Sequence, residues 1–158
     1  MKILSIDRTK CSGCGLCQSV CSLVKKSRVQ PSQARIRVRR TGGRDTEYVT
    51  FCQHCAEPVC VTACLKGIID KDLRTGLVSR DTKGCFACAA CSVMCPMDAI
   101  VHDTDQDIYV TCDTCGGDPE CVKICPAGAL RFCEASEASR SIRSRNGESL
   151  FIHKEVRP

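Results

Sequence analysis

The sequence predicts a small α+β fold of short strands and one-turn helices, with little of the apolar core that a chain of this length normally builds. Of its 158 residues, 17 are cysteine, whereas only four are Phe, two are Tyr and none is Trp. Mean hydropathy is −0.10, and no run approaches the roughly 18 apolar residues that span a bilayer. We therefore expect no membrane span, and a stabilising group other than large side chains.

Short apolar runs and turn residues place the individual elements. Pro58 suits the first turn of a helix, and Asp118 is a candidate N-cap for a helix that carries Cys121. The turn Arg74–Gly76 separates two apolar pairs and predicts a hairpin. The expected strands are 3–6, 68–69, 77–79, 108–110 and 129–132, and the expected helical turns are 17–24 and those that begin near 58 and 119.

Sixteen of the cysteines form four groups of four, and only Cys133 is left over. Residues 1–8 contain no apolar core of a signal peptide, so we expect a cytoplasmic chain. Disulfides are rare in that reducing compartment, and an odd number would leave one thiol unpaired. The sequence therefore predicts metal binding. The groups are Cys11, Cys14, Cys17 and Cys21; Cys52, Cys55, Cys60 and Cys64; Cys85, Cys88, Cys91 and Cys95; and Cys112, Cys115, Cys121 and Cys125.

The spacing within the groups favours iron–sulfur clusters over zinc. A structural zinc site takes two pairs of ligands with about a dozen or more residues between the pairs. Here three cysteines are close together, and the fourth follows four residues later. The third group, followed by Pro96, reproduces the bacterial C-x2-C-x2-C-x3-C-P run, whose fourth cysteine ligates the other cluster of a pair. A zinc-binding adaptor is the alternative from another functional class.

The residues after the groups repeat as well. Residues 64–69, 95–100 and 125–130 share the pattern C-x4-[I/L], which indicates an internal repeat. With these motifs, residues 1–133 resemble the four-cluster iron–sulfur subunits of the dimethyl-sulfoxide-reductase type. Residues 34–38, the widened second group and residues 112–121 most resemble the small subunit of a bacterial tungsten aldehyde oxidoreductase.

The resemblance implies two ferredoxin-like dicluster halves and four [4Fe-4S] clusters. Groups one and four form one half, and groups two and three form an inserted half at about 48–105. Sequential pairing of groups, one with two and three with four, remains the alternative. The implied ligands are Cys11, Cys14, Cys17 and Cys125 for cluster A; Cys112, Cys115, Cys121 and Cys21 for cluster B; Cys52, Cys55, Cys60 and Cys95 for cluster C; and Cys85, Cys88, Cys91 and Cys64 for cluster D.

The function implied is electron transfer without catalysis, and we identify no catalytic residue. The expected partner is a large catalytic subunit with a tungsten- or molybdenum-pterin, which oxidises an aldehyde. A flavin subunit or a ferredoxin is the expected acceptor, and copies of this chain could associate into a longer path. A formate-, hydrogen- or carbon-monoxide-linked system is the alternative. Residues 134–158 are either a tail or a strap that binds a partner.

The formal charge of +5 does not indicate nucleic-acid binding. Each oxidised cluster with four thiolates contributes about −2, so the loaded protein is near −3, and no stacking aromatics accompany the basic residues. Arg35, Arg37 and Arg39 alternate with apolar residues, as on a solvated hairpin face or a docking surface. His54 is either a loop residue or a hydrogen-bond donor to a cluster, and Cys133 is expected to be a buried structural thiol.

Overall fold

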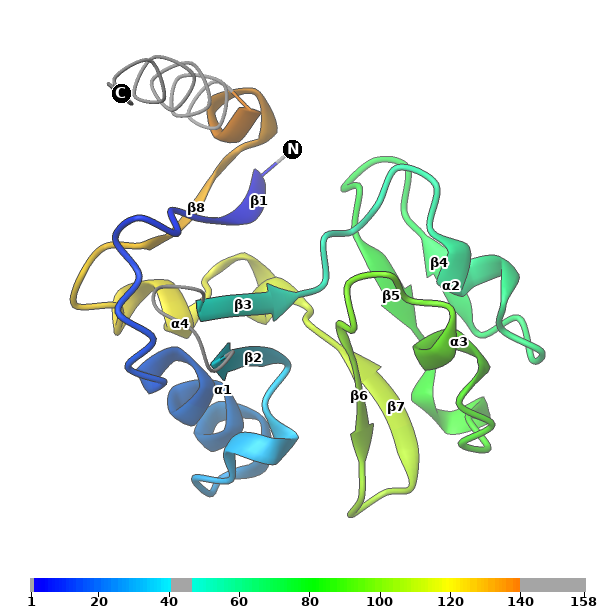
Figure 1. Ribbon diagram of the computed structural model, residues 1–158. Helices are drawn as coiled ribbons and strands as arrows, with labels where there is room; N and C mark the ends of the chain where they lie inside the picture. The colour runs from blue at the N-terminus through cyan, green and yellow to red at the C-terminus, as the bar shows by residue number, and fades with distance from the viewer. Residues whose placement is uncertain (1, 41–46, 140–158) are drawn as a thin grey trace, which may run out of the picture.

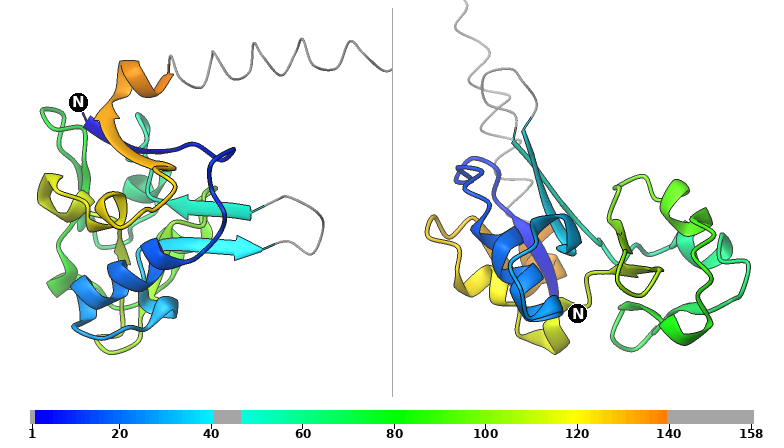
Figure 2. Two further views of the ribbon diagram at one scale, coloured as in Figure 1. Left: turned by 90° about the vertical axis from the view of Figure 1, so that its left-hand side faces the viewer. Right: turned by 90° about the horizontal axis from the view of Figure 1, so that it is seen from below.

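The computed structural model describes residues 2–40 and 47–139, which form two lobes that lie side by side (Figures 1 and 2). We call residues 2–40, 47–51 and 112–139 the terminal lobe, and residues 52–111 the central lobe. Among the described residues, no helix is long and apolar enough to cross a membrane.

The terminal lobe is built from both ends of the chain. Strand β1 (Lys2–Ile6) pairs antiparallel with β8 (Leu130–Glu134), so that Leu4 lies opposite Phe132. Between them come α1 (Leu16–Lys26), η1 (Pro31–Gln33), the antiparallel pair β2 (Ile36–Arg40) and β3 (Glu47–Phe51), η3 (Thr114–Gly117) and α4 (Glu120–Lys123).

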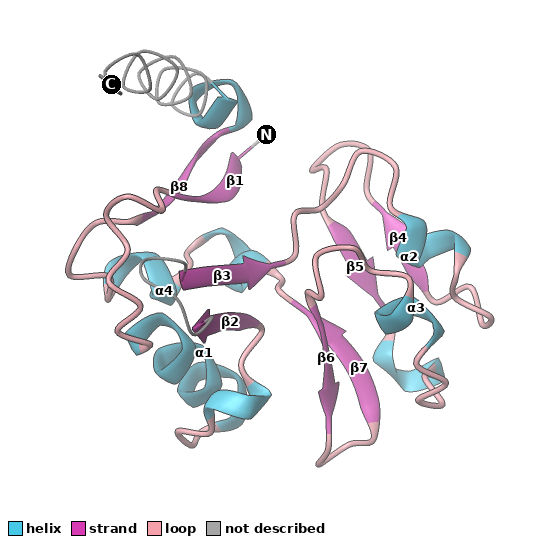
Figure 3. Ribbon diagram, in the orientation of Figure 1, coloured by secondary structure: helices cyan, strands magenta, loops and turns pink. Residues whose placement is uncertain are grey.

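The central lobe has shorter elements (Figure 3). Its helices are α2 (Val59–Thr62), η2 (Thr82–Gly84) and α3 (Ala90–Val93). Its strands are β4 (Ile69–Lys71), β5 (Val78–Arg80), β6 (Ile100–Asp103) and β7 (Ile108–Thr111), paired antiparallel as β4–β5 and β6–β7. The expected hairpin around residues 74–76 is confirmed, and the mixture of small helices and two-stranded sheets is an α+β arrangement.

Each lobe buries only a few apolar side chains. In the terminal lobe Ile36, Phe51 and Leu130 pack with cysteines that include Cys21 and Cys121. In the central lobe Ile69, Val78 and Ile100 pack around Cys91. Cysteines therefore take core positions that large side chains occupy in ordinary domains.

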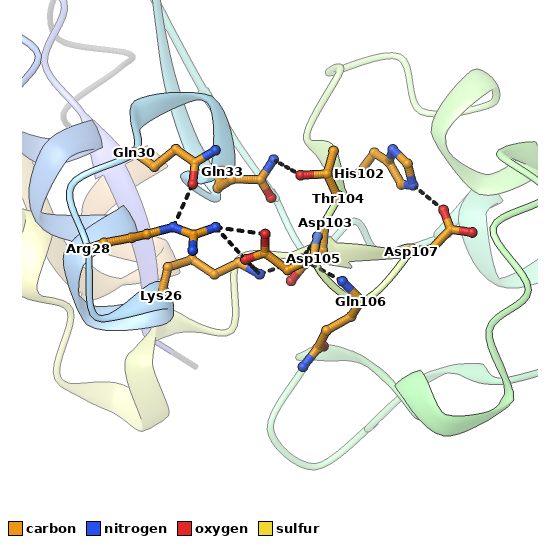
Figure 4. A network of polar contacts seen from close by, with 10 residues as sticks. All are labelled: Lys26, Arg28, Gln30, Gln33, His102, Asp103, Thr104, Asp105, Gln106 and Asp107. Atoms are coloured by element: carbon orange, nitrogen blue, oxygen red, sulfur yellow. Dashed lines mark hydrogen bonds and ion pairs between the residues drawn. The ribbon is translucent and has the colours of Figure 1, made fainter.

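Ion pairs join the two lobes where α1 meets the β6–β7 turn (Figure 4). Lys26 binds Asp103, and its Nζ also lies 3.1 Å from Asp105 Oδ2. Arg28 donates to both carboxylate oxygens of Asp105 at 2.7 Å. The amide of Gln33 adds a hydrogen bond of 3.2 Å to the hydroxyl of Thr104.

Two sequence-based predictions need correction. Helix α1 extends from Leu16 to Lys26 rather than over 17–24, and both lysines of its last turn have partners: Lys25 pairs with Asp113 in the same lobe and Lys26 with Asp103 in the other. Asp118 does not cap α4: Pro119 is in the N-cap position, and Asp118 pairs with Lys123 instead, at 2.5 Å. Of the expected tail or strap at 134–158, Glu134 is the last residue of β8. Residues 140–158, with the apolar run Leu150–Ile152 and His153, lie outside the described residues.

Candidate metal centres

Four cavities in the protein are each lined by four cysteines. Three cysteines of each cavity come from one sequence group, and the fourth comes from a different group. The cavities have volumes of about 330 to 390 Å³, with open space at the mouth included. Cavity A holds Cys11, Cys14, Cys17 and Cys125; cavity B holds Cys21, Cys112, Cys115 and Cys121; cavity C holds Cys52, Cys55, Cys60 and Cys95; and cavity D holds Cys64, Cys85, Cys88 and Cys91.

These four sets are the ones implied by the resemblance, and they join group one with group four and group two with group three. Helix geometry explains the exchange of the fourth cysteine. Cys17 and Cys21 lie on one face of α1, about 6 Å apart along its axis, and they line cavities A and B respectively. Cysteines four residues apart at the three short helices are divided between two cavities in the same way: Cys60 and Cys64, Cys91 and Cys95, and Cys121 and Cys125.

The loops that carry the first two cysteines of each group share an unusual backbone conformation. The residue before the second cysteine has a positive φ in all four: Gly13 at 61°, His54 at 47°, Ala87 at 54° and Thr114 at 55°. Three of these residues are not glycine, and a positive φ is costly for them. Backbone strain of this kind is concentrated at ligand-holding sites.

A second repeated turn follows the fourth cysteine of three groups. Gly67, Asp98 and Gly128 have positive φ, and each donates its N–H to the carbonyl of the cysteine three residues earlier, at 3.0 to 3.1 Å. This turn is the structural form of the C-x4-[I/L] repeat. Asp98 takes the place that glycine has in the other two turns, and its carboxylate pairs with Arg37 at 3.3 Å and also with Arg39.

Most of the thiols with altered acidity are made less acidic by burial. Burial raises the pKa of Cys17 and Cys52 to about 11, and that of Cys112 and Cys121 to about 12. Burial also opposes ionisation of Cys64, but the nearby backbone N–H groups of residues 66–69 favour its thiolate and lower its pKa overall. Since only the thiolate is a metal ligand, loading the cavities releases protons.

The cavities differ in the charges around them. On cavity B, Asp113 pairs with Lys25 at 2.9 Å and with Arg35 at 2.6 Å. The backbone N–H of Arg35 also donates to Cys21 Sγ at 3.3 Å. Cavity D is lined by Arg80 and Lys66. Among the described residues that line cavities A and C, none is charged.

His54 is a buried residue, 4% exposed, although sequence reasoning left open whether it is simply a loop residue. The backbone N–H of Val78 donates to its Nδ1 at 3.0 Å, which puts any ring proton of the neutral form on Nε2. Burial lowers the pKa of His54 and favours that neutral form. Within the described part of the chain, Nε2 has no hydrogen-bond partner.

Cys133 lies apart from the cavities. It is half-buried on β8, opposite Ile3, and its sulfur is 3.7 Å from Ser5 Oγ. The Cys133 thiol is thus less buried than expected, because β1–β8 is only a two-stranded sheet and leaves part of its surface exposed to solvent. His102 on β6 has a partly exposed side chain with two partners: its Nε2 lies 2.8 Å from Asp107 Oδ1, and its ring stacks on Tyr109.

The donor set fits a cluster better than a single ion. Within residues 2–40 and 47–139, no three His, Cys, Asp or Glu side chains are grouped so that they could hold one metal ion. Four thiols spread around one cavity suit a group with several metal corners, each of which takes one thiolate.

Comparison with known proteins identifies the family. Residues 46–135 match the family described as the 4Fe-4S dicluster domain. The chain belongs to this family. It is 37% identical over 121 residues to the polyferredoxin-like subunit of aliphatic sulfonate oxidoreductase from Pyrococcus furiosus. That alignment covers 76% of this chain and 69% of the subunit. It is 30% identical over 166 residues to one subunit of the anaerobic dimethyl sulfoxide reductase from Haemophilus influenzae, with 92% of this chain and 78% of that subunit covered.

The match to a third relative is only partial in length. The chain is 36% identical over 130 residues to the beta subunit of NADH-dependent phenylglyoxylate dehydrogenase from Aromatoleum evansii; this covers 81% of the chain but 29% of that subunit. Among solved structures, a chain of the active site complex BamBC of benzoyl coenzyme A reductase superposes with a TM-score of 0.52 at 27% identity, covering 91% of this chain and 88% of that one. The 4Fe-4S dicluster family and this likeness support the ferredoxin-like fold and [4Fe-4S] clusters as the bound groups.

Proposed function

We propose that this chain is a non-catalytic electron-transfer subunit that carries four [4Fe-4S] clusters, one in each of cavities A, B, C and D. The observation that carries the proposal is the gathering of sixteen cysteines, in sets of four, around four cavities. Each set provides one thiolate for each iron of a cubane, so no iron position is left open for a substrate. When bound, such clusters accept and release single electrons at potentials set by ligation, burial and hydrogen bonding.

The cavities follow one another along the molecule, which supports a continuous path. Cys17 of cavity A lies close enough to Cys121 of cavity B for its negative charge to oppose ionisation of Cys121. Cys52 of cavity C opposes ionisation of Cys112 of cavity B in the same way, across the boundary between the lobes. Arg80 lies between Cys91 of cavity D and Cys60 of cavity C. The order of transfer would therefore be A, B, C and D, or the reverse.

We propose that each lobe holds one pair of clusters, with groups one and four in one dicluster half and groups two and three in an inserted half at about 48–105. The lobe contacts of Lys26 and Arg28 would keep the two pairs at a fixed separation. The chain itself thus contributes the spacing, the exclusion of water and the N–H donors.

For the partner, we favour a large catalytic subunit with a tungsten- or molybdenum-pterin that oxidises an aldehyde, and a flavin subunit or ferredoxin as acceptor, in the cytoplasm. The support is that the three relatives named above are subunits of redox enzymes: a dehydrogenase, an oxidoreductase and a reductase. A formate-, hydrogen- or carbon-monoxide-linked system is the second candidate, and self-association of the chain would lengthen the path.

The ligand sets are tested by one alanine variant for each cavity in anaerobically prepared protein. Cys14→Ala, Cys115→Ala, Cys55→Ala and Cys88→Ala should each lower iron by about one to four atoms from a total of about 16. Cys133→Ala is the matched control and should keep all the iron. Retention of full iron in any of the four variants, or zinc in place of iron, would contradict the assignment.

The partner is tested on the native complex. The complex should contain tungsten or molybdenum, and an aldehyde should bleach the visible absorption of the clusters. Bleaching by formate, hydrogen or carbon monoxide, with no response to aldehydes, would instead select the second candidate.

A further inference from the structure

Arg80, at the end of β5, has a guanidinium group that uses only some of its hydrogen-bond donors within the described protein. Its Nη1 donates to the carbonyl of Tyr109 at 3.0 Å and lies 3.7 Å from Cys91 Sγ. Its Nε and Nη2 are inaccessible to solvent, and within the described residues they have no hydrogen-bond partner. A buried donor without an acceptor costs about 1–3 kcal/mol, and more when the group is charged.

The position of Arg80 indicates where the missing acceptors lie. The residue lines cavity D together with Cys64, Cys85 and Cys91. In strand β5, Val78 and Arg80 project to the same face, and Val78 lines the neighbouring cavity C. The charge of Arg80 also favours the thiolate of Cys60 in cavity C. The unsatisfied N–H groups therefore lie beside the two cysteine sets of the central lobe.

The charge of Arg80 is not cancelled by the protein. Arginine stays protonated at every working pH, and among the described residues no carboxylate forms an ion pair with Arg80 or lines cavity D. Lys66 adds a second cation there, although it is exposed and rests on the ring of Phe86. In cavity B, by contrast, Lys25 and Arg35 both pair with Asp113, and a second carboxylate, Glu120, also lines the cavity.

From this asymmetry, we propose that Arg80 donates to sulfur atoms of the cluster in cavity D and makes that cluster the one with the highest reduction potential of the four. The inference rests on the proposed function, since it requires that cavity D is loaded. A fixed positive charge in a site of low dielectric stabilises the added electron, and hydrogen bonds to the sulfur atoms of a cluster act in the same direction. Electrons would then collect at the cavity D end of the path.

The test is a redox titration of anaerobic, iron-loaded protein, followed by electron paramagnetic resonance and visible absorption. In the unaltered protein one cluster should be reduced before the other three, and Cys88→Ala should remove that feature whereas Cys14→Ala should not. Arg80→Gln should shift the same feature so that its reduction equilibrium is about tenfold less favourable, which is about 59 mV for one electron. Arg74→Gln is the matched control, because it removes one exposed positive charge from the same hairpin, and it should leave the titration unchanged.

The Arg80→Lys variant separates charge from structure. It keeps the positive charge but not the planar fork, so its potential should lie between those of the unaltered protein and Arg80→Gln. If Arg80→Gln loses iron, a loaded Arg80→Lys with a potential near the original supports the proposal. Loss of iron in both variants would assign Arg80 to maintenance of the fold and overturn the proposal. An unshifted titration in loaded Arg80→Gln would do the same, whereas unaltered protein without iron would overturn the proposed function itself.

Discussion

The two lobes hold their cysteines in the same local geometry but differ in what surrounds the cavities. The terminal lobe has an 11-residue helix, the β2–β3 hairpin and a buried Phe51. The central lobe has short helices, and the buried cluster around Ile69 and Cys91 contains no large aromatic side chain. The charges beside cavity B are paired, whereas Arg80 beside cavity D has no paired carboxylate among the described residues. One cysteine pattern is thus compatible with different packing and different electrostatics around the cavities.

Removal of iron should have the largest effect and should expose the difference between the lobes. Most of the folding free energy of such a chain comes from metal ligation, and the buried apolar residues of the central lobe are divided between two small clusters, one around Ile69 and one around Val101. We expect chelated, reduced protein to lose its cooperative thermal transition, with amide exchange at unfolded rates throughout 52–111. Any residual protection should lie in α1 and the β1–β8 sheet. Native-like protection of β4–β7 in iron-free protein would contradict this expectation.

Truncation of Phe51 should weaken the terminal lobe selectively. Phe51 is 2% exposed and packs with Ile36 in that lobe, and Phe→Ala changes in cores cost about 3–5 kcal/mol. Hydrogen exchange on iron-loaded Phe51→Ala should show faster opening of β2 and β3. Val78→Ala, at a buried position of the central lobe, is the comparison, and it should leave the exchange of β2 and β3 unchanged. Equal opening of both lobes in Phe51→Ala would mean that they unfold as one unit.

Loss of the lobe contact should have a somewhat smaller effect. Asp103 and Lys26 are both largely buried, with side chains 7% and 11% exposed, and removal of one partner of such a pair costs about 3 kcal/mol. Asp103→Asn should therefore destabilise the native state, as measured by hydrogen exchange. Asp105→Asn should have a clearly smaller effect, because its side chain is 41% exposed and solvent screens its ion pairs. A larger loss of stability in Asp105→Asn would show that the Arg28–Asp105 pair, and not Lys26–Asp103, is the more important contact between the lobes.

The same pair gives a pH dependence. Burial opposes ionisation of Asp103, but the hydrogen bond and charge of Lys26, together with the backbone N–H groups of Asp105 and Gln106, outweigh it and lower the pKa of Asp103. Since the folded pKa lies below the unfolded value, the stabilisation is complete above about pH 4 and is lost as pH falls through the folded pKa. Hydrogen exchange of the β6–β7 turn, followed at decreasing pH and stopped before the acid-labile clusters lose their visible absorption, should report the onset of this loss in the unaltered protein but not in Asp103→Asn. An identical acid response of the two proteins would exclude the pair as its source.

Asp98 should show the smallest effect. Its pair with Arg39 is exposed and its pair with Arg37 is only partly buried, and ion pairs at the surface contribute about 0–1 kcal/mol. Asp98→Asn keeps a side chain that tolerates positive φ but loses the charge, so the stability of the loaded protein should fall by less than about 1 kcal/mol. A loss well above that range would show that these arginines hold the β2–β3 hairpin against the central lobe.

The cysteine spacing predicted more of this molecule than any other feature of the sequence. The grouping of the cysteines indicated iron–sulfur clusters. The spacing of four residues indicated short helical turns, because cysteines that far apart on one helix lie on the same face and can reach neighbouring cavities. The partners of isolated charges were not predictable: Arg37 on β2 and Asp98 in the turn before β6 are 61 residues apart and belong to different lobes (Figure 1). Nor could the sequence show that Arg80 lacks a carboxylate partner among the described residues, or that Lys123 and not the helix N-terminus would engage Asp118.

The central claim is that four sets of four cysteines each hold one cubane cluster, and a count of iron and acid-labile sulfide per chain in anaerobically isolated protein tests it most directly. We predict about 16 of each for every chain, with brown colour and paramagnetic signals on reduction. Pale protein with a few zinc ions and no sulfide, or a stable stoichiometry of about eight irons, would contradict it.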